Sequence, residues 1–408
     1  MRRNRHLGIL LWGCFILLAV CSVPAHSQVN LQKASAANSQ LIPAVAADGA
    51  EAWLVTFGPG EAYWERFGHN AIWLREPAAS LDHTFNFGFF DFEQEDFFLR
   101  FLRGKMMYFS VAQPAAREFE FYQQQNRSIR LQKLNLNAAE YRRLSSYLLN
   151  EIQPENRNYH YDYYLNNCST RIRDAIDLAL NGELANATEE LPSALDFRGQ
   201  TRRLTQSQFW YYLGLEIALG YPVDRPISQW DNMFIPMVVA DQIANLGRPS
   251  GASLVSEELQ LYISTLPPAP DMPSSVWLRY LFAGLLLAGL YWLSVGKAAS
   301  RWVGRLSMTW ALLLGGCGLG LGFLWLFTDH SVTVSNINVL LFNPLLLIAL
   351  APVMKRFAAV LLVAGVAISV ALLLFARHQY NIDVLALLAP MNLSVAAYWL
   401  LQRNRIVG

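Results

Sequence analysis

The chain has 408 residues, of which 53% are hydrophobic, and its formal net charge is +1. The apolar residues are distributed so unevenly, with long runs after residue 276, that a single soluble globular protein is excluded. Residues 28–275 contain 29 acidic and 20 basic residues, and this acidic balance argues against binding to nucleic acid.

The first 27 residues have the pattern of a signal peptide. A basic cluster at residues 2–5 precedes an apolar run over residues 7–20, and residues 25–27 suit signal peptidase. Cys21 raises the alternative of a lipid anchor, which we disfavour because the residue before it is not small. The rest of the chain is therefore expected to start outside the cytoplasm.

Three soluble segments follow the predicted signal peptide. Residues 28–50 lack a hydrophobic period and are expected to form a flexible lead-in, and residues 266–276 form a Pro-rich linker. Between them, residues 51–265 are polar enough for a globular extracytoplasmic domain. This domain contains one cysteine, so it has no internal disulfide although its compartment is oxidising.

The domain begins with short segments typical of strands, residues 52–57, 69–74 and 83–90. A hairpin centred on residues 78–79 would place Gly88 opposite His69. Asn86 would then lie close to His69.

Two helices follow with clear boundary signals. A capping box at residues 137–140 opens the first, and the second is expected to begin at Asn166 or Asn167 and to end before Gly182. From there to residue 275 we expect helical and then irregular chain.

The last part, residues 277–402, is expected to be a five-helix transmembrane domain. Its apolar runs are residues 277–295, 308–327, 338–353, 357–375 and 382–401, of which the third is the shortest. With the preceding domain outside, the outer loops hold only Arg377, and the predicted cytoplasmic segments hold Lys297, Arg301, Arg305, Lys355, Arg356, Arg403 and Arg405. The charges predict a bacterial inner-membrane protein with a periplasmic domain and a cytoplasmic C-terminus.

Cys168 is the first candidate for chemistry, because it lies in the first turn of the second predicted helix. Free N–H groups and the helix dipole stabilise a thiolate there, and Arg171 and Arg173 add positive potential, so we expect a lowered thiol pKa. A thiolate suits covalent catalysis. The alternative is a buried structural cysteine on the apolar face that it shares with Ile172.

His69 is the candidate general base, since it opens an apolar strand and can reach a helix N-terminus. A structural turn histidine is the competing interpretation. Asn86 is the better candidate to orient the imidazole and His83 the second, although both could be merely structural. No Cys/His spacing matches a zinc site, and we predict neither a metal nor a cofactor.

These residues belong to longer strings, residues 67–72, 85–88 with 90–92, 103–105 with Tyr108, and 166–174. In these strings the chain resembles the Lnb family, bacterial proteins named for a lipoprotein N-acyltransferase of Bacteroides-type bacteria. The likeness extends to residues 329–330, 336–338 and 343–344 of the membrane half, and so covers most of the chain.

The resemblance implies an α+β outer domain with a permuted papain-like fold, similar to lecithin:retinol acyltransferase and related to NlpC-type hydrolases. In that fold the histidine precedes the cysteine. His69 then matches the base and Cys168 the nucleophile.

The function that follows is acyl transfer from a membrane phospholipid, through a thioester on Cys168, to the N-terminal amine of a diacylated lipoprotein. We expect substrate contacts from Asn167, Ser169 and Arg171, with backbone N–H groups at residues 168–169 as an oxyanion hole. His330 and Asn338 are candidates for a lipid-headgroup site, or else part of a solvated loop.

Two other functions fit the same residues. The acyl-enzyme could pass to water, which would make the protein a thioesterase, a phospholipase or a peptidoglycan amidase. Alternatively, the outer domain is a non-catalytic binding or sensor module of the envelope, in which Cys168 is buried and unreactive.

Overall fold

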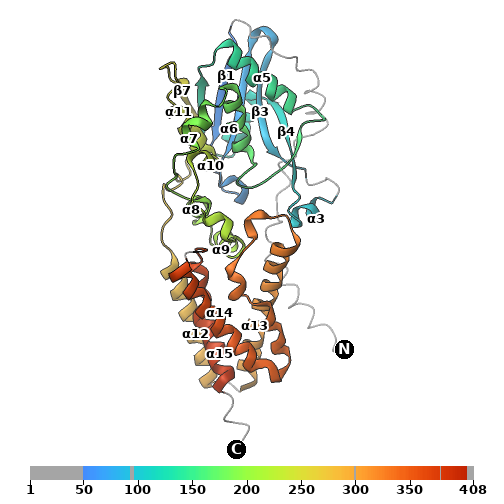
Figure 1. The fold of residues 1–408 in the computed structure, drawn as a ribbon, viewed down its shortest axis with the longest axis vertical. Coiled ribbons are helices and arrows are strands. Elements are labelled where there is room, and N and C mark those ends of the chain that lie inside the picture. The colour runs from blue at the N-terminus through green and yellow to red at the C-terminus, as the bar shows by residue number, and fades with distance from the viewer. Residues whose placement is uncertain (1–48, 92–95, 298–299, 377, 402–408) are drawn as a thin grey trace, which may run out of the picture.

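The computed structural model describes residues 49–91, 96–297, 300–376 and 378–401. They form an α+β domain stacked end to end on a bundle of long helices (Figure 1). The predicted signal peptide, nearly all of the lead-in and the basic residues Arg403 and Arg405 lie outside the described residues.

The outer domain is built on a seven-stranded antiparallel sheet with the order β6-β4-β3-β2-β1-β5-β7. The strands are β1 Glu51–Phe57, β2 His69–Glu76, β3 Leu81–Phe89, β4 Met107–Pro114, β5 Ile129–Leu134, β6 Asn158–His160 and β7 Val255–Tyr262. The three strands predicted from the sequence are confirmed. β7 pairs with β5 in a segment that we expected to be irregular. The sequence does not reveal this strand because its side chains are mostly exposed and show no apolar period.

The β2–β3 hairpin has the register that the sequence predicts, with Ala71 opposite Asn86 and Glu76 opposite Leu81. Pro77–Ala79 form the turn, and Ser80 closes it in the left-handed conformation with φ 53°. A slip of one residue would move every apolar side chain of β3 to the other face, so burial fixes this register.

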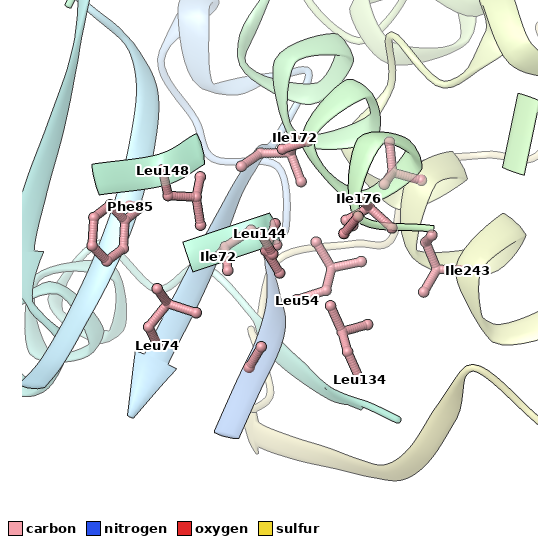
Figure 2. Close-up of a cluster of buried hydrophobic side chains, with 14 of the residues drawn as sticks. Leu54, Ile72, Leu74, Phe85, Leu134, Leu144, Leu148, Ile172, Ile176 and Ile243 are labelled. Atoms are coloured by element: carbon pink, nitrogen blue, oxygen red, sulfur yellow. The ribbon is translucent and has the colours of Figure 1, made fainter. Parts of the chain in front are cut away.

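Helices cover both faces of the sheet. On one face lie α5 (Ala138–Glu151), α6 (Cys168–Ala179) and α11 (Pro236–Asn245), and their buried side chains meet those of β1, β2 and β3 (Figure 2). Leu54, Ile72, Leu144 and Ile172 are fully buried there, and each such side chain contributes about 1.5–3 kcal/mol. On the opposite face, α4 (Ala115–Gln124) packs through Tyr122.

Both predicted helix starts are confirmed. The Asn137 side chain accepts from the N–H groups of Ala139 and Glu140, and Asn167 caps α6 in the same way. The shorter helices are α3 Phe97–Leu102, α7 Glu183–Thr188, α8 Phe197–Thr205, α9 Phe209–Ala218 and α10 Gln229–Asn232, and the 3₁₀ turns of this part are η1 Tyr63–Glu65, η2 Pro77–Ala79 and η3 Tyr221–Asp224.

Among the described residues, four helices are long and apolar enough to cross a membrane. They are carried by α12 Trp277–Lys297, α13 Ser300–Phe327, α14 Lys355–Ala371 with the π-helical turn η8 Leu372–Ala376, and α15 Ile382–Leu401. The third apolar run, expected to be a fifth helix, forms 3₁₀ turns instead: η4 Ser331–Thr333 precedes it, and η5 Ile337–Leu340, η6 Pro344–Leu350 and η7 Pro352–Met354 make it up.

This irregular run still traverses the bundle. Asn336, at its start, donates to the Ile217 carbonyl of α9, and Gln379, just beyond α14, donates to Leu219, so both lie beside the outer domain. Residues 337–354 therefore cover the distance that α14 covers on its return. Eighteen residues span about 36 Å at the 2.0 Å rise of a 3₁₀ helix but only about 27 Å as an α-helix. Pro344 and Pro352 also lack the N–H donors that a continuous α-helix would need at these positions.

Neighbouring helices accommodate this backbone through glycine. A Cβ atom at Gly318 of α13 would collide with the carbonyl oxygen of Phe342, and one at Gly365 of α14 with that of Leu340. Small residues allow such close approach in membrane proteins. The first part of the non-helical run thus packs between α13 and α14, which suits backbone polar groups in a membrane, whereas Leu350 and Val353 near its end are exposed.

Candidate active site

Cys168 is the first residue of α6, and its cap holds it rigidly. The Asn167 carboxamide oxygen accepts from the N–H groups of Ser169 and Thr170 at 2.9 and 3.0 Å. The Asn167 nitrogen donates to the carbonyls of Tyr163 and Phe234 at 3.0 and 2.9 Å. Every polar atom of this side chain is used, so Asn167 positions the cysteine and has nothing left for a substrate.

The N-terminus of α6 places Cys168 against β2 and β3 where the pairing of the two strands ends. The ladder between the two strands ends at Ala71 and Asn86, and Gly88 turns away with φ +92°. A Cβ atom at Gly88 would lie only 3.4 Å from that of Cys168, and the backbone N–H of Asn70 points at the sulfur. The thiol therefore lies at the opening of the hairpin, where His69 begins β2.

Asn86 fixes the tautomer of His69. The Asn86 nitrogen donates to the Thr84 carbonyl at 3.3 Å and to Glu118 Oε2 at 3.1 Å, so its oxygen faces His69 Nε2, at 2.9 Å. That oxygen only accepts, hence Nε2 carries the hydrogen and Nδ1 of the neutral ring keeps its lone pair. Asn86 lies beside His69 as the hairpin register predicts, and its part in catalysis stays a prediction.

Burial keeps Cys168 and His69 neutral. Desolvation lowers the pKa of His69 to about 4; the hydrogen bond that His69 donates to Asn86 opposes this shift, and the positive charge of Arg127 adds to it. Desolvation also raises the pKa of the Cys168 thiol, although the N–H groups of Asn70 and Ser169 favour the thiolate. Our expectation of a lowered thiol pKa is therefore wrong, because removal from water outweighs the helix terminus.

Two buried residues behind the pair were missed in the sequence. Glu118 of α4 accepts from Asn86, and burial raises the pKa of its carboxyl to about 7 despite its hydrogen bonds to Thr84 and Asn86. Arg127 lies over the Tyr122 ring at 4.6 Å and donates to the Gly58 carbonyl, while its Nη2 has no partner in the described part of the chain. Glu118 could have been noticed, since it shares a helical face with Ala115 and Tyr122.

The other residues predicted around the cysteine have structural partners. Arg171 pairs with Glu151 at 3.3 Å and lies over the Tyr159 ring at 4.3 Å. The positive charge that favours the Cys168 thiolate comes from Arg127 instead. Ser169 is fully buried, with its Oγ 3.9 Å from the Cys168 sulfur. The described residues contain no group of three His, Cys, Asp or Glu side chains suited to a metal.

Of the two backbone N–H groups predicted to form an oxyanion hole, one is already used in a hydrogen bond. The Ser169 N–H is taken by the Asn167 cap, whereas the Cys168 N–H has no acceptor among the described residues. An N–H group on the nucleophile itself, at a helix terminus, is well placed for an oxyanion.

Two protein-family profiles match the chain. A family profile described as the Lnb N-terminal periplasmic domain matches residues 38–207, and a second, the Lnb transmembrane domain, matches residues 278–405. The chain belongs to the Lnb family. No curated protein and no solved structure matches the chain.

The two candidate residues in the Lnb transmembrane domain lie at its joint with the periplasmic domain. Asn338 is fully buried, donates to the carbonyl of Glu216 at 2.8 Å and accepts from Asn381 at 3.2 Å. His330 Nε2 lies 2.9 Å from the carbonyl oxygen of Phe101. Both side chains link the two domains, and their expected contact with a lipid headgroup stays a prediction.

Proposed function

We propose that this Lnb-family protein is a thiol acyltransferase that moves an acyl chain from a membrane phospholipid to the N-terminal amine of a diacylated lipoprotein. Cys168 is the nucleophile, His69 the base and Asn86 the residue that orients it. The observation that carries this proposal is the oriented imidazole, whose Nε2 is held by Asn86, on the residue that precedes Asn70, whose backbone N–H points at the Cys168 sulfur.

In the first half-reaction, the thiol proton passes to His69 Nδ1 while the sulfur attacks the ester carbonyl carbon. The Cys168 N–H stabilises the oxyanion of the tetrahedral intermediate. Its collapse breaks the ester C–O bond, and the departing alkoxide takes the proton back from His69. The products are a lysophospholipid and a thioester on Cys168.

In the second half-reaction, the neutral α-amine of the lipoprotein attacks the thioester carbonyl and gives a proton to His69. The C–S bond then breaks, an amide forms, and the Cys168 sulfur leaves with the proton from His69. Because the pKa of His69 is lowered to about 4, the imidazole is neutral and can accept a proton at the start of each half-reaction.

The order of the site along the chain supports a permuted papain-like arrangement, with the strand histidine first, its orienting residue on the next strand and the helix cysteine last. Asn86 holds the Nε2 side of the ring, which leaves Nδ1 for the thiol. The antiparallel sheet with α6 against one face is compatible with that fold.

We also propose that the bundle sits in the inner membrane with the C-terminus in the cytoplasm. Arg305, Lys355 and Arg356 lie where α13 and α14 begin, at the ends away from the periplasmic domain, as the excess of basic residues on the cytoplasmic side requires (Figure 1). Five crossings, one of them the 3₁₀ run, put the last residues on that same side.

The test is a Cys168→Ala variant expressed in a strain that lacks its own N-acyltransferase. We expect lipoproteins to be N-acylated with the wild-type chain and to remain diacylated with the variant. N-acylation that persists in the variant would reject the transfer mechanism.

A second experiment separates transfer from hydrolysis. Purified protein is incubated with labelled phospholipid, with and without a diacylated acceptor peptide. We expect label on the peptide amine and little free fatty acid, whereas fatty acid release at the same rate with and without peptide would identify a hydrolase.

A further inference from the structure

The short helix α3 (Phe97–Leu102) exposes apolar side chains that nothing in the described protein covers. Phe98 is 61% exposed, Leu99 and Leu102 are each 42% exposed, and no residue of the helix is buried. An exposed apolar helix on a soluble domain needs a partner, since isolated patches of this kind are costly in water.

The backbone fixes α3 at the periplasmic end of the membrane bundle, beside α13 (Figure 1). The Asp329 N–H donates to the Arg103 carbonyl at 2.8 Å, and His330 Nε2 lies 2.9 Å from the Phe101 carbonyl oxygen. Gly104 packs so tightly on this segment that an added Cβ would lie 2.6 Å from the His330 nitrogen. The height of α3 is therefore set by rigid contacts.

α3 therefore lies level with the end of a candidate membrane span. The span carried by α13 ends at Phe327, two residues before Asp329, and its last residues Leu326 and Phe327 are 70% and 71% exposed. The apolar surface of α3 thus continues that of a membrane-spanning helix. Arg100 and Arg103 accompany the apolar side chains, a combination that suits helices lying among lipid headgroups.

Aromatic rings lie both next to α3 and next to the candidate active site. The Phe97 ring lies 6.0 Å from that of Phe90, and the ring of the preceding residue, Phe89, lies 6.5 Å from that of His69. Phe90 also lies 5.1 Å from Tyr108. An acyl chain leaving the bilayer at α3 would meet apolar surface on the way to the imidazole.

We propose that α3 is embedded in the periplasmic leaflet of the membrane and admits the acyl chain of a phospholipid to the aromatic side chains that lead to His69 and Cys168. The embedding stands on the contacts that the end of α3 makes with Asp329 and His330, just beyond α13. The admission of a substrate chain rests, in addition, on the proposed acyltransferase function.

The first experiment measures depth. A spin label is attached to the full-length protein at Phe98→Cys or, as control, at Arg117→Cys on the exposed side of α4, with the four native cysteines replaced by alanine. In vesicles of phosphatidylethanolamine and phosphatidylglycerol, we expect the label at 98 to collide mainly with oxygen and the label at 117 mainly with a soluble nickel chelate. Equal access of nickel to both positions would overturn the embedding.

The second experiment measures substrate entry. We compare the rate of transfer from bilayer phospholipid with the rate on a water-soluble short-chain ester, and take their ratio. In Phe98→Asp we expect the ratio to fall by at least about tenfold, since the variant loses the burial of one Phe side chain in the bilayer. In Phe121→Asp, which changes an equally aromatic but distant side chain that is 41% exposed, we expect the wild-type ratio.

The outcomes distinguish the two proposals. A wild-type ratio in Phe98→Asp overturns the role of α3 in substrate entry. If the wild-type protein forms no Cys168 thioester with either ester, the proposed function fails, and the depth measurement still decides whether α3 lies in the membrane.

Discussion

Two clusters of buried polar groups differ in how their charges are matched. At the joint between the domains, Arg202 binds Glu216 and Asp383, and Arg198 binds Asp224 at 2.7 Å. Around Cys168 and His69, the thiol and the imidazole are neutral, and Arg127 forms no ion pair with any described carboxylate. Matched charges hold a structure together, whereas neutral acids and bases next to each other are ready to exchange a proton.

The largest effect that the comparison predicts is on activity. His69→Gln keeps much of the side-chain volume and removes the base, so turnover of a soluble ester should fall about 10²- to 10⁴-fold. The apparent unfolding midpoint should stay near that of the wild type, because the imidazole forms no ion pair in the described structure.

His83→Gln is the matched control. His83 lies three residues before Asn86 on β3, so its side chain is on the opposite face of the sheet, and we expect wild-type turnover. Equal losses in the two variants would show that histidine replacement damages the fold and would remove His69 from the mechanism.

The next effect is on stability. Glu216→Ala leaves Arg202 with Asp383 and takes one partner from each of two buried guanidinium groups, since Arg198 also approaches Glu216 at 3.6 Å. Loss of a partner in a buried pair costs about 3–5 kcal/mol, and we expect a matching fall in the free energy of unfolding in detergent.

Asp241→Ala provides the contrast. Asp241 pairs with Arg130 at 2.7 Å but is 62% exposed, and such surface pairs contribute about 0–1 kcal/mol. If both variants unfold at the same temperature as the wild type, the charges at the joint are not what holds the domains together.

Local patterns were enough to predict part of the site. The alternation in β2 and β3 fixes the hairpin register, and that register alone places Asn86 beside His69. The cap of α6 follows in the same way from Asn167 and the apolar stripe behind it. In both cases the information lies within a few turns of one element and its neighbour.

The remainder depended on tertiary packing. Glu118 and Arg127 reach the site from α4 and from the turn before β5. The apolar face of α4 indicates that Glu118 is buried, but no local pattern assigns either residue to the site. The pKa of Cys168 depends on how much protein surrounds the sulfur, which a helix position does not disclose. Asn338 looked like a loop residue because its partners, Glu216 and Asn381, are far away in the sequence.

The protonation state of the pair gives a third prediction. Because burial raises the pKa of Cys168, the thiolate fraction at neutral pH is small, and alkylation by iodoacetamide should accelerate about tenfold per pH unit from pH 6 to 9. Mass spectrometry of the Cys168 peptide gives the rate. A plateau that begins near pH 5 would instead reveal a preformed thiolate–imidazolium pair and would break the contrast between neutral and charged clusters.

The smallest effect concerns Glu118. Its pKa is raised to about 7, so the carboxyl ionises as the pH passes neutrality. The negative charge strengthens the hydrogen bond that Glu118 accepts from the Asn86 amide, polarises that amide and makes His69 more basic. Wild-type turnover should therefore rise severalfold between pH 6 and 8, a step that Glu118→Gln should abolish while it keeps an acceptor for Asn86.

Stability should move in the opposite direction, over a lower pH range. A carboxyl with a pKa raised by folding stabilises the native state fully below its ordinary pKa of 4.5, and this contribution is lost by the time the pH has risen through about 7. Wild-type protein should thus lose stability between pH 4.5 and about 7, and Glu118→Gln should lose less. If the variant keeps the wild-type step in turnover, Glu118 does not act on His69 through Asn86, whatever its contribution to stability.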